Sequence, residues 1–208
     1  GHTVPALYAV LAEKGYFSKD ILMTYRKMGT ILQGHPDIKK TPGLDMSTGS
    51  LGQGFSVACG MAMASKLDNA PWRVYTLLGD GEVQEGIVWE AAMSAAHYKL
   101  DNMVAFLDYN GLQIDGKTED VMNIGPIVDK FKAFGWNVIE IDGHDFDQIF
   151  AALDMAKETV GKPTMIIAKT IKGKGVSFME NQAGWHGAAP SDSDLERALL
   201  DLGGVDND

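Results

Sequence analysis

The chain has 208 residues, of which 45% are hydrophobic and 22% are charged, a composition typical of a globular protein with its own core. Its formal net charge of -10 excludes a nucleic-acid or anionic-membrane surface as the main function, because such a surface needs a basic face. A small anionic ligand is not excluded, since one site can be positive within an acidic protein.

The single cysteine, Cys59, lies in an apolar run and is expected to be buried and structural. It allows no disulfide within the chain, which indicates a reducing compartment. No apolar stretch approaches the length of about 20 residues that spans a bilayer, and no signal peptide is visible after Gly1. We therefore expect a cytoplasmic protein.

Helix-like and strand-like segments alternate along the chain. Helices are expected over residues 5–14, from 18–21 onward, from the glycine turn 49–54 to about 67, and over 86–100, 126–135, 145–160 and 193–202. Strands are expected over 73–78, 103–109, 137–142 and 163–170, with a long polar loop over 29–48 and a frayed end over 203–208.

This alternation predicts the fold class. Strands of about six residues separated by longer helices are typical of right-handed βαβ units. We expect an α/β protein with one domain over residues 1–208, built on an open, mostly parallel sheet flanked by helices. The end of the chain, from Ser191, is an acidic tail.

Two polar side chains follow neighbouring predicted strands. Asp80 comes after strand 73–78 in the turn Gly-Asp-Gly, and Asn110 comes after strand 103–109. Ligands of open parallel sheets bind at the carboxyl ends of the strands, so both side chains are expected at one edge. A carboxylate, an amide oxygen and a nearby backbone carbonyl suit Mg²⁺ or Ca²⁺, and a diphosphate could complete a Mg²⁺ shell. Alternatively, Asp80 is only a turn residue.

The same residues carry a family resemblance. The turn Gly79–Gly81 followed by Asn110 resembles the thiamine diphosphate fingerprint. The stretches GHPDIKKTPGLDMSTGSLGQG, GDGEVQEGIVWEAAMSAAHYKLDNMVAFLDYNGLQIDG and WHGAAP resemble the cofactor-diphosphate-binding domain of transketolase, in the expected order, from residue 1 to about 190. The resemblance implies the thiamine diphosphate-binding fold, with thiamine diphosphate and Mg²⁺ or Ca²⁺ as cofactors.

The resemblance also implies which residues hold the metal and the diphosphate. Asp80, Asn110 and the main-chain oxygen of Leu112 match metal ligands. Gly79 and Gly81 match glycines that let the backbone approach the diphosphate, which requires the absence of a Cβ. Tyr109 precedes Asn110 where the general fingerprint often has a second asparagine.

Further positions are implied to lie around the rest of the cofactor. Ile114 matches a residue beside the thiazolium ring, and Gly49 and Leu51 match residues that contact the aminopyrimidine. Glu85 matches a glutamate at the subunit interface that couples two cofactor sites.

Three of the five histidines fall in matching motifs. His2, His35 and His186 match active-site histidines that contact the diphosphate or act on substrate hydroxyls. Histidine suits this task because its ordinary pKa is about 6.5. Without the resemblance His35 and His186 would each be structural more often than not, and His97 and His144 are interpreted as structural. The lysine-rich stretch 169–175 is expected to be a solvated loop, with closure over the cofactor as the alternative.

The activity implied is transfer of a two-carbon ketol unit from a ketose phosphate to an aldose phosphate. In the family, a glutamate from a separate pyrimidine-binding domain activates the cofactor, and no such domain follows in these residues. We expect the amino-terminal subunit of a split transketolase, or a piece of a longer one. Two copies of this chain are expected to assemble with two copies of a pyrimidine-binding subunit. The helix expected over 86–100 is apolar almost all round, which fits an interface. An upstream family segment with a further histidine has no match here.

Other functions remain open at this stage. The nearest rival is the α subunit of a thiamine diphosphate-dependent 2-oxo acid dehydrogenase, and a non-catalytic cofactor-binding subunit is another. A nicotinamide-binding Rossmann domain fits worst, because no GxGxxG follows the first strand. The sugar is not identified, and the only arginines, Arg26, Arg73 and Arg197, leave the phosphate-binding group open.

Overall fold

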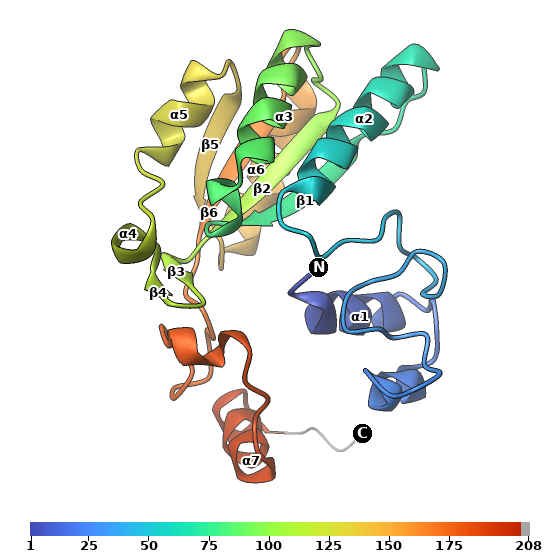
Figure 1. The fold of residues 1–208 in the computed structure, drawn as a ribbon, viewed down its shortest axis with the longest axis vertical. Helices are drawn as coiled ribbons and strands as arrows, with labels where there is room; N and C mark the ends of the chain where they lie inside the picture. Colours follow the sequence, from blue (N-terminus) through green and yellow to red (C-terminus); the bar gives the residue numbers. More distant parts are fainter. Residues whose placement is uncertain (205–208) are drawn as a thin grey trace.

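A four-stranded parallel sheet forms the centre of the protein, for which a computed structural model describes residues 1–204 (Figure 1). The strands are β1 (Val74–Gly79), β2 (Met103–Tyr109), β5 (Asn137–Asp142) and β6 (Thr164–Lys169), in the order β1-β2-β6-β5. Every pair is parallel, so all four carboxyl ends meet at one edge. The predicted fold class is confirmed.

The burial of each strand follows its place in the sheet. β2 and β6 lie in the middle and are covered on both faces, which explains their continuous apolar sequences. β1 and β5 lie at the edges, where buried and more exposed residues are mixed. Successive side chains of β2 point to opposite faces: Met103 and Ala105 belong to one core and Val104 to the other.

Helices cover the two faces unequally. The larger core lies under α2 (Gln53–Leu67), α3 (Gly86–His97) and α5 (Ile127–Ala133), and the smaller core lies under α6 (Phe146–Glu158), on the other side of the sheet (Figure 1). Cys59 is buried in the larger core, as expected. α3 buries one side through small residues such as Ala91 and Ala95, while Met93 on its other side is exposed.

The N-terminal segment forms a separate small core on the carboxyl side of the sheet. It contains α1 (Val4–Glu13), the 3-10 helix η1 (Lys19–Thr24) and residue Leu32. The Tyr8 hydroxyl donates to the Gln33 carbonyl at 2.9 Å, which fixes the start of the expected loop 29–48 on α1. The short helix expected from residue 18 is a 3-10 helix over Lys19–Thr24.

Several short elements were not predicted. They are η2 (Glu82–Gln84), the hairpin β3 (Leu112–Gln113) and β4 (Gly116–Lys117), α4 (Thr118–Val121) and η3 (Ala183–His186). The acidic tail contains α7 (Asp192–Asp201), close to its expected range, with a capping box at Ser191. Residues 205–208 of the predicted frayed end lie outside the described residues.

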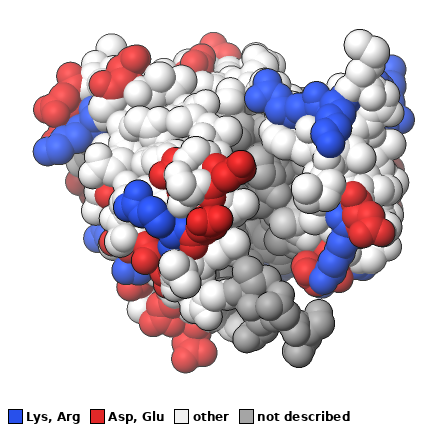
Figure 2. Space-filling model, turned by 90° about the horizontal axis from the view of Figure 1, so that it is seen from below, with Lys and Arg blue, Asp and Glu red and all other residues white. Residues whose placement is uncertain are grey.

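Charged side chains are unevenly placed on the face seen from below. Basic and acidic side chains of the described residues form separate groups there, the most extended basic one at the upper right (Figure 2). Across residues 1–204, no helix is both long and apolar enough to cross a membrane.

Candidate functional site

A cavity of about 310 Å³ opens at the carboxyl edge of the sheet, between the ends of β1 and β2 and the segments that carry His2 and His186. Most predicted site residues line it: His2, Leu51, Gly79, Asp80, Gly81, Glu85, Asn110, Leu112, Ile114 and His186. A second cavity of about 650 Å³, between α2 and β1, adjoins it and is lined by Gly49. The polar groups converge in the smaller cavity, which we take as the candidate site.

Asp80 does more than shape a turn. Its Oδ1 accepts a hydrogen bond from Gly81 N at 2.8 Å, and its Oδ2 accepts from Gly111 N at 2.6 Å and from the Thr118 hydroxyl at 3.2 Å. The carboxylate thereby joins the end of β1 to the loop that follows β2. Asn110 Oδ1 accepts from Leu112 N at 2.9 Å within that loop.

The environment of Asp80 suits a cation. The side chain is 2% exposed, and burial raises its pKa, although the hydrogen bonds from Gly111, Gly81 and Thr118 act in the opposite direction. No Lys, Arg or His of the described residues forms an ion pair with it. A buried carboxylate without a cationic partner beside amide and carbonyl oxygens is a donor set that Mg²⁺ or Ca²⁺ prefers.

This donor set contains a single charged side chain. Within residues 1–204, no group of three or more His, Cys, Asp or Glu side chains is placed to hold a metal ion. A metal at Asp80 would therefore depend on neutral oxygens of the protein and on the ligand's own charge.

The three predicted histidines come together. The ring centroids of His2 and His35 lie 5.0 Å apart, and those of His2 and His186 lie 6.3 Å apart. Gly49 makes this packing possible: its φ is +143°, and a Cβ there would lie 2.7 Å from Cδ2 of His35. His35 and Gly49 themselves do not line the smaller cavity but lie directly behind His2.

Two of these histidines have lowered pKa values, although both residues are exposed. Burial and then the neighbouring His35 lower the pKa of His2, while burial and then Lys172 lower the pKa of His186. Both shifts favour the uncharged imidazole, which can accept a proton or a hydrogen bond. His97 is exposed at the end of α3, and His144 Nε2 accepts a hydrogen bond from Ile171 N at 2.8 Å; neither lines the cavity.

Glu82 is a residue to which sequence reasoning assigned no role. Its Oε1 accepts from Gly52 N at 2.9 Å and its Oε2 from Gly79 N at 3.1 Å. It thus connects the start of α2 with the Gly-Asp-Gly turn. Its partner Gly52 lies 30 positions earlier in the chain, so no local pattern could have revealed the contact.

Lys172 is a second residue that was missed. It is the one Lys or Arg among the described residues lining the cavity. The expectation of a solvated lysine loop holds for Lys169 and Lys174, which pair with Glu140 at 3.1 Å and Glu180 at 3.7 Å on the surface. Lys172, in the turn after β6, is half-buried and lines the cavity.

Comparison with known proteins agrees with the resemblance. The chain matches the model of the transketolase thiamine diphosphate binding domain over residues 1–207, so the match extends past residue 190 and includes α7. It is 50% identical over 202 residues to a 6-deoxy-6-sulfo-D-fructose transketolase subunit from a Clostridium species, covering 97% of this chain and 74% of that protein. A subunit of the apulose-4-phosphate transketolase from Phocaeicola vulgatus is 46% identical, with 97% and 72% covered.

Longer relatives share the same region. Human transketolase is 46% identical over 188 residues, which cover 90% of this chain and 30% of that protein. The crystal structure of the Campylobacter jejuni transketolase superposes with a TM-score of 0.91 at 36% identity, covering 97% of this chain and 33% of that one. The chain belongs to the transketolase family and has the fold of its thiamine diphosphate-binding domain.

Proposed function

We propose that this chain is the amino-terminal subunit, or the corresponding part, of a transketolase that works with a separate pyrimidine-binding subunit. The observation that carries the proposal is that Asp80, Asn110 and Leu112 line one cavity at the carboxyl edge of the sheet, close to three histidines. The naming of two relatives as transketolase subunits supports the division between two chains.

In this proposal the strand ends hold a metal and a diphosphate. Asp80, the Asn110 side-chain oxygen and the Leu112 carbonyl bind Mg²⁺ or Ca²⁺, and Lys172 balances the negative charge of the diphosphate. A Cβ at Gly79 would point into open space, which a bound diphosphate can use. A Cβ at Gly81 would lie 3.2 Å from Cβ of Gln113, so glycine also avoids a tight contact there. Thiamine diphosphate, when bound, supplies a carbanion and an electron sink.

The histidines handle protons and substrate oxygens. The lowered pKa values of His2 and His186 favour the uncharged imidazole, which accepts hydrogen bonds and can take a proton from a substrate hydroxyl. His35 contacts the ring of His2 and orients it. A cofactor-binding subunit without catalysis would not need this cluster, which favours an enzyme.

The rim of the cavity is where the partner subunit would lie. Leu51 and Ile114 are 40% and 65% exposed beside the cavity, and Glu85 is exposed there as well. Ile114 would pack near the thiazolium, Gly49 and Leu51 near the aminopyrimidine, and Glu85 at the interface of an assembly of two copies of each subunit.

The proposed reaction is transfer of a two-carbon ketol unit between sugar phosphates, and we expect it in the cytoplasm. The family match disfavours the 2-oxo acid dehydrogenase α subunit.

Calorimetric titration with thiamine diphosphate tests the proposal. The wild-type chain should bind the cofactor with a requirement for Mg²⁺, and Asp80→Ala should lose that requirement along with most of the affinity. Asn110→Ala provides a second variant, because Asp80→Ala leaves three donors without their acceptor and is expected to fold less stably. Asp129→Ala, on α5 away from the cavity, is the matched control. Absence of cofactor binding by the wild type would refute the proposal, and unchanged affinity in Asp80→Ala would remove Asp80 from the metal site.

A further inference from the structure

Lys172 and His186 reach the candidate site from one segment, residues 171–187, here called the histidine segment. It leaves the end of β6 and contains little regular structure besides η3. A hydrogen bond from Asn181 N to the Lys172 carbonyl at 2.9 Å folds the segment back on itself. The positions of both site residues therefore depend on what fixes the outer side of this segment.

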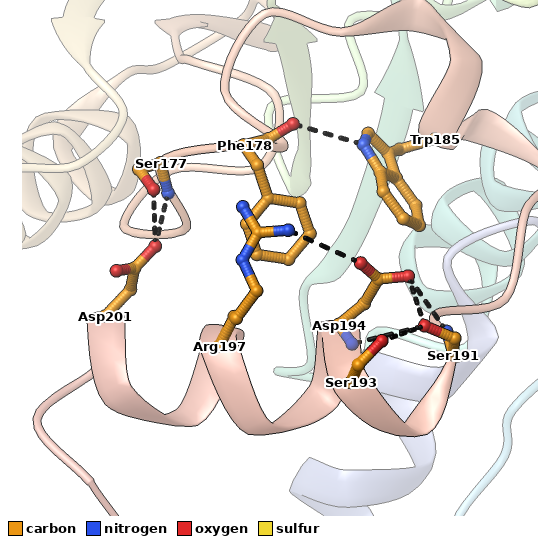
Figure 3. Close-up of polar contacts among 8 residues, drawn as sticks. All are labelled: Ser177, Phe178, Trp185, Ser191, Ser193, Asp194, Arg197 and Asp201. Carbon is orange, nitrogen blue, oxygen red and sulfur yellow. Dashed lines mark hydrogen bonds and ion pairs between the residues drawn. The ribbon is translucent and has the colours of Figure 1, made fainter.

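α7 contacts that outer side directly (Figure 3). Asp201 Oδ2 accepts hydrogen bonds from the backbone N–H of Ser177 at 2.8 Å and from its hydroxyl at 2.7 Å. The Arg197 guanidinium lies 4.3 Å from the centroid of the Phe178 ring, within the range of a cation-π contact. α7 thus holds two successive residues of the segment, one by its backbone and one by its ring.

The contact continues from Phe178 to His186. The rings of Phe178 and Trp185 meet edge to face at 5.7 Å, and Trp185 Nε1 donates to the Phe178 carbonyl at 3.3 Å (Figure 3). Trp185 directly precedes His186 in the chain. The orientation of the Phe178 ring is thereby linked to the position of the histidine.

α7 is itself oriented at its first turn. Ser191 and Asp194 form a reciprocal capping box, and Asp194 also lies 3.8 Å from the Arg197 guanidinium (Figure 3). Arg197 is therefore placed between a carboxylate on its own helix and the Phe178 ring.

No residue of α7 lines the cavity, so the helix can influence the site only through the histidine segment. Its polar contacts with the segment lie at the surface: the Arg197 side chain is 60% exposed, and contacts of this kind are individually weak. Of the α7 residues, Ala198 is buried. Because the segment is held by several weak contacts outside the two sheet cores, removing two of them should loosen it while the sheet stays folded.

We propose that α7 is a positioning element of the candidate site, and that Arg197 and Asp201 are positioning residues that hold Lys172 and His186 at the cavity. The importance of that placement for catalysis rests on the proposed function. The geometric claim, that α7 sets the place of His186, can be tested without any ligand.

The experiment is nuclear magnetic resonance of the histidine side chains in the full chain at fixed pH. The five histidines give few imidazole signals, and the His186 signals are assigned by their loss in His186→Gln. The double variant Arg197→Ala/Asp201→Ala should shift or broaden the signals of His186 but not those of His97, which lies on α3. Trp185 emission, isolated by comparison with Trp185→Phe, should move to longer wavelength as its contact with Phe178 loosens.

Two controls separate the possible outcomes. Glu196→Gln changes an exposed charge on the same helix and should leave both signals at their wild-type positions. The single variants Arg197→Lys and Arg197→Ala are also compared. Arg197→Lys keeps a cation over Phe178, so its His186 signals should lie closer to those of the wild type than the signals of Arg197→Ala do. Unchanged His186 and Trp185 signals in the folded double variant would overturn the proposal. Failure of the wild type to bind thiamine diphosphate would refute the proposed function and leave this test unaffected.

Discussion

At the scale of single residues, Glu82 carries the first prediction, because its carboxylate receives the N–H groups of Gly52 and Gly79. Glu82→Ala leaves both donors unpaired, which should lower the free energy of unfolding by about 1–3 kcal/mol and weaken thiamine diphosphate binding. Urea denaturation and calorimetric titration measure the two effects.

Glu82→Gln is the matched control for this change. Its amide keeps one acceptor oxygen, so its stability and affinity should fall between those of the wild type and Glu82→Ala. If Glu82→Ala were as stable as the wild type and bound thiamine diphosphate as tightly, the hydrogen bonds of Glu82 to Gly52 and Gly79 would contribute neither to stability nor to binding.

Cys59 gives a prediction that depends on pH. Burial raises the pKa of its thiol to about 12, so the reactive thiolate is scarce in the folded protein at pH ~8. A thiol-directed reagent should label the native chain very slowly at that pH and rapidly in denaturant. The pKa of the Cys59 thiol is higher in the folded chain than in the unfolded chain. The stability that the neutral thiol contributes is therefore fully present below the unfolded-state pKa and is lost as the pH rises through the folded-state pKa. Rapid labelling of the native chain would contradict the burial.

What the sequence predicts about these residues depends on the range of their contacts. Asp80 and Asn110 follow strands directly, so a parallel-sheet pattern alone predicts that they meet. His2 and His186 could be assigned to the site only through the family resemblance. The roles of Glu82 and Lys172 were not predicted, because they depend on partners distant in the sequence.

At the scale of elements, α5 carries the next prediction through Phe131. This side chain is fully buried, and its ring lies 5.1 Å from that of Trp89 and 5.7 Å from that of Trp136. Phe131→Ala removes these contacts and leaves a cavity, which should lower the free energy of unfolding by about 3–5 kcal/mol. Phe150→Ala, at a position 61% exposed on α6, should change it by less than about 0.5 kcal/mol. Equal losses in the two variants would argue against the packing described for α5.

The long helices and all four central strands were predicted because their sequence signals, helical composition or a short apolar run bounded by turn residues, extend over a whole element. The hairpin β3–β4, α4 and the 3-10 helices η2 and η3 were missed, since two to four residues are too few to display a period. These short elements shape the loop that holds Leu112 and place Thr118 on Asp80. The detailed geometry of the candidate site was therefore the part least accessible from sequence.

At the scale of the whole molecule, the strand order illustrates the same limit. Continuous apolar runs predicted a parallel sheet, but they did not place β6, the last strand in the described chain, between β2 and β5. That placement depends on pairing over long sequence separations, which local patterns do not encode.

The proposed division of the site between two chains gives a prediction for the whole protein. The isolated chain should bind thiamine diphosphate but show no ketol transfer in an isotopic assay with sugar phosphates, and addition of the pyrimidine-binding subunit should restore turnover. Mixing that subunit with Asn110→Ala provides the control, because turnover should then stay low. Substantial turnover by the isolated chain would contradict the division.

The histidine cluster also has a consequence for the order of folding. His2 and His186 are far apart in the sequence, yet their rings lie 6.3 Å from each other. Contacts of such sequence separation have a high loop-closure entropy and form late, and during synthesis the part around His2 leaves the ribosome long before the segment after β6. The edge that carries Asp80 and Asn110 is formed by the ends of β1 and β2, which are synthesised before the segment after β6. A nascent chain should therefore acquire its diphosphate-facing oxygens first and its complete set of histidines last.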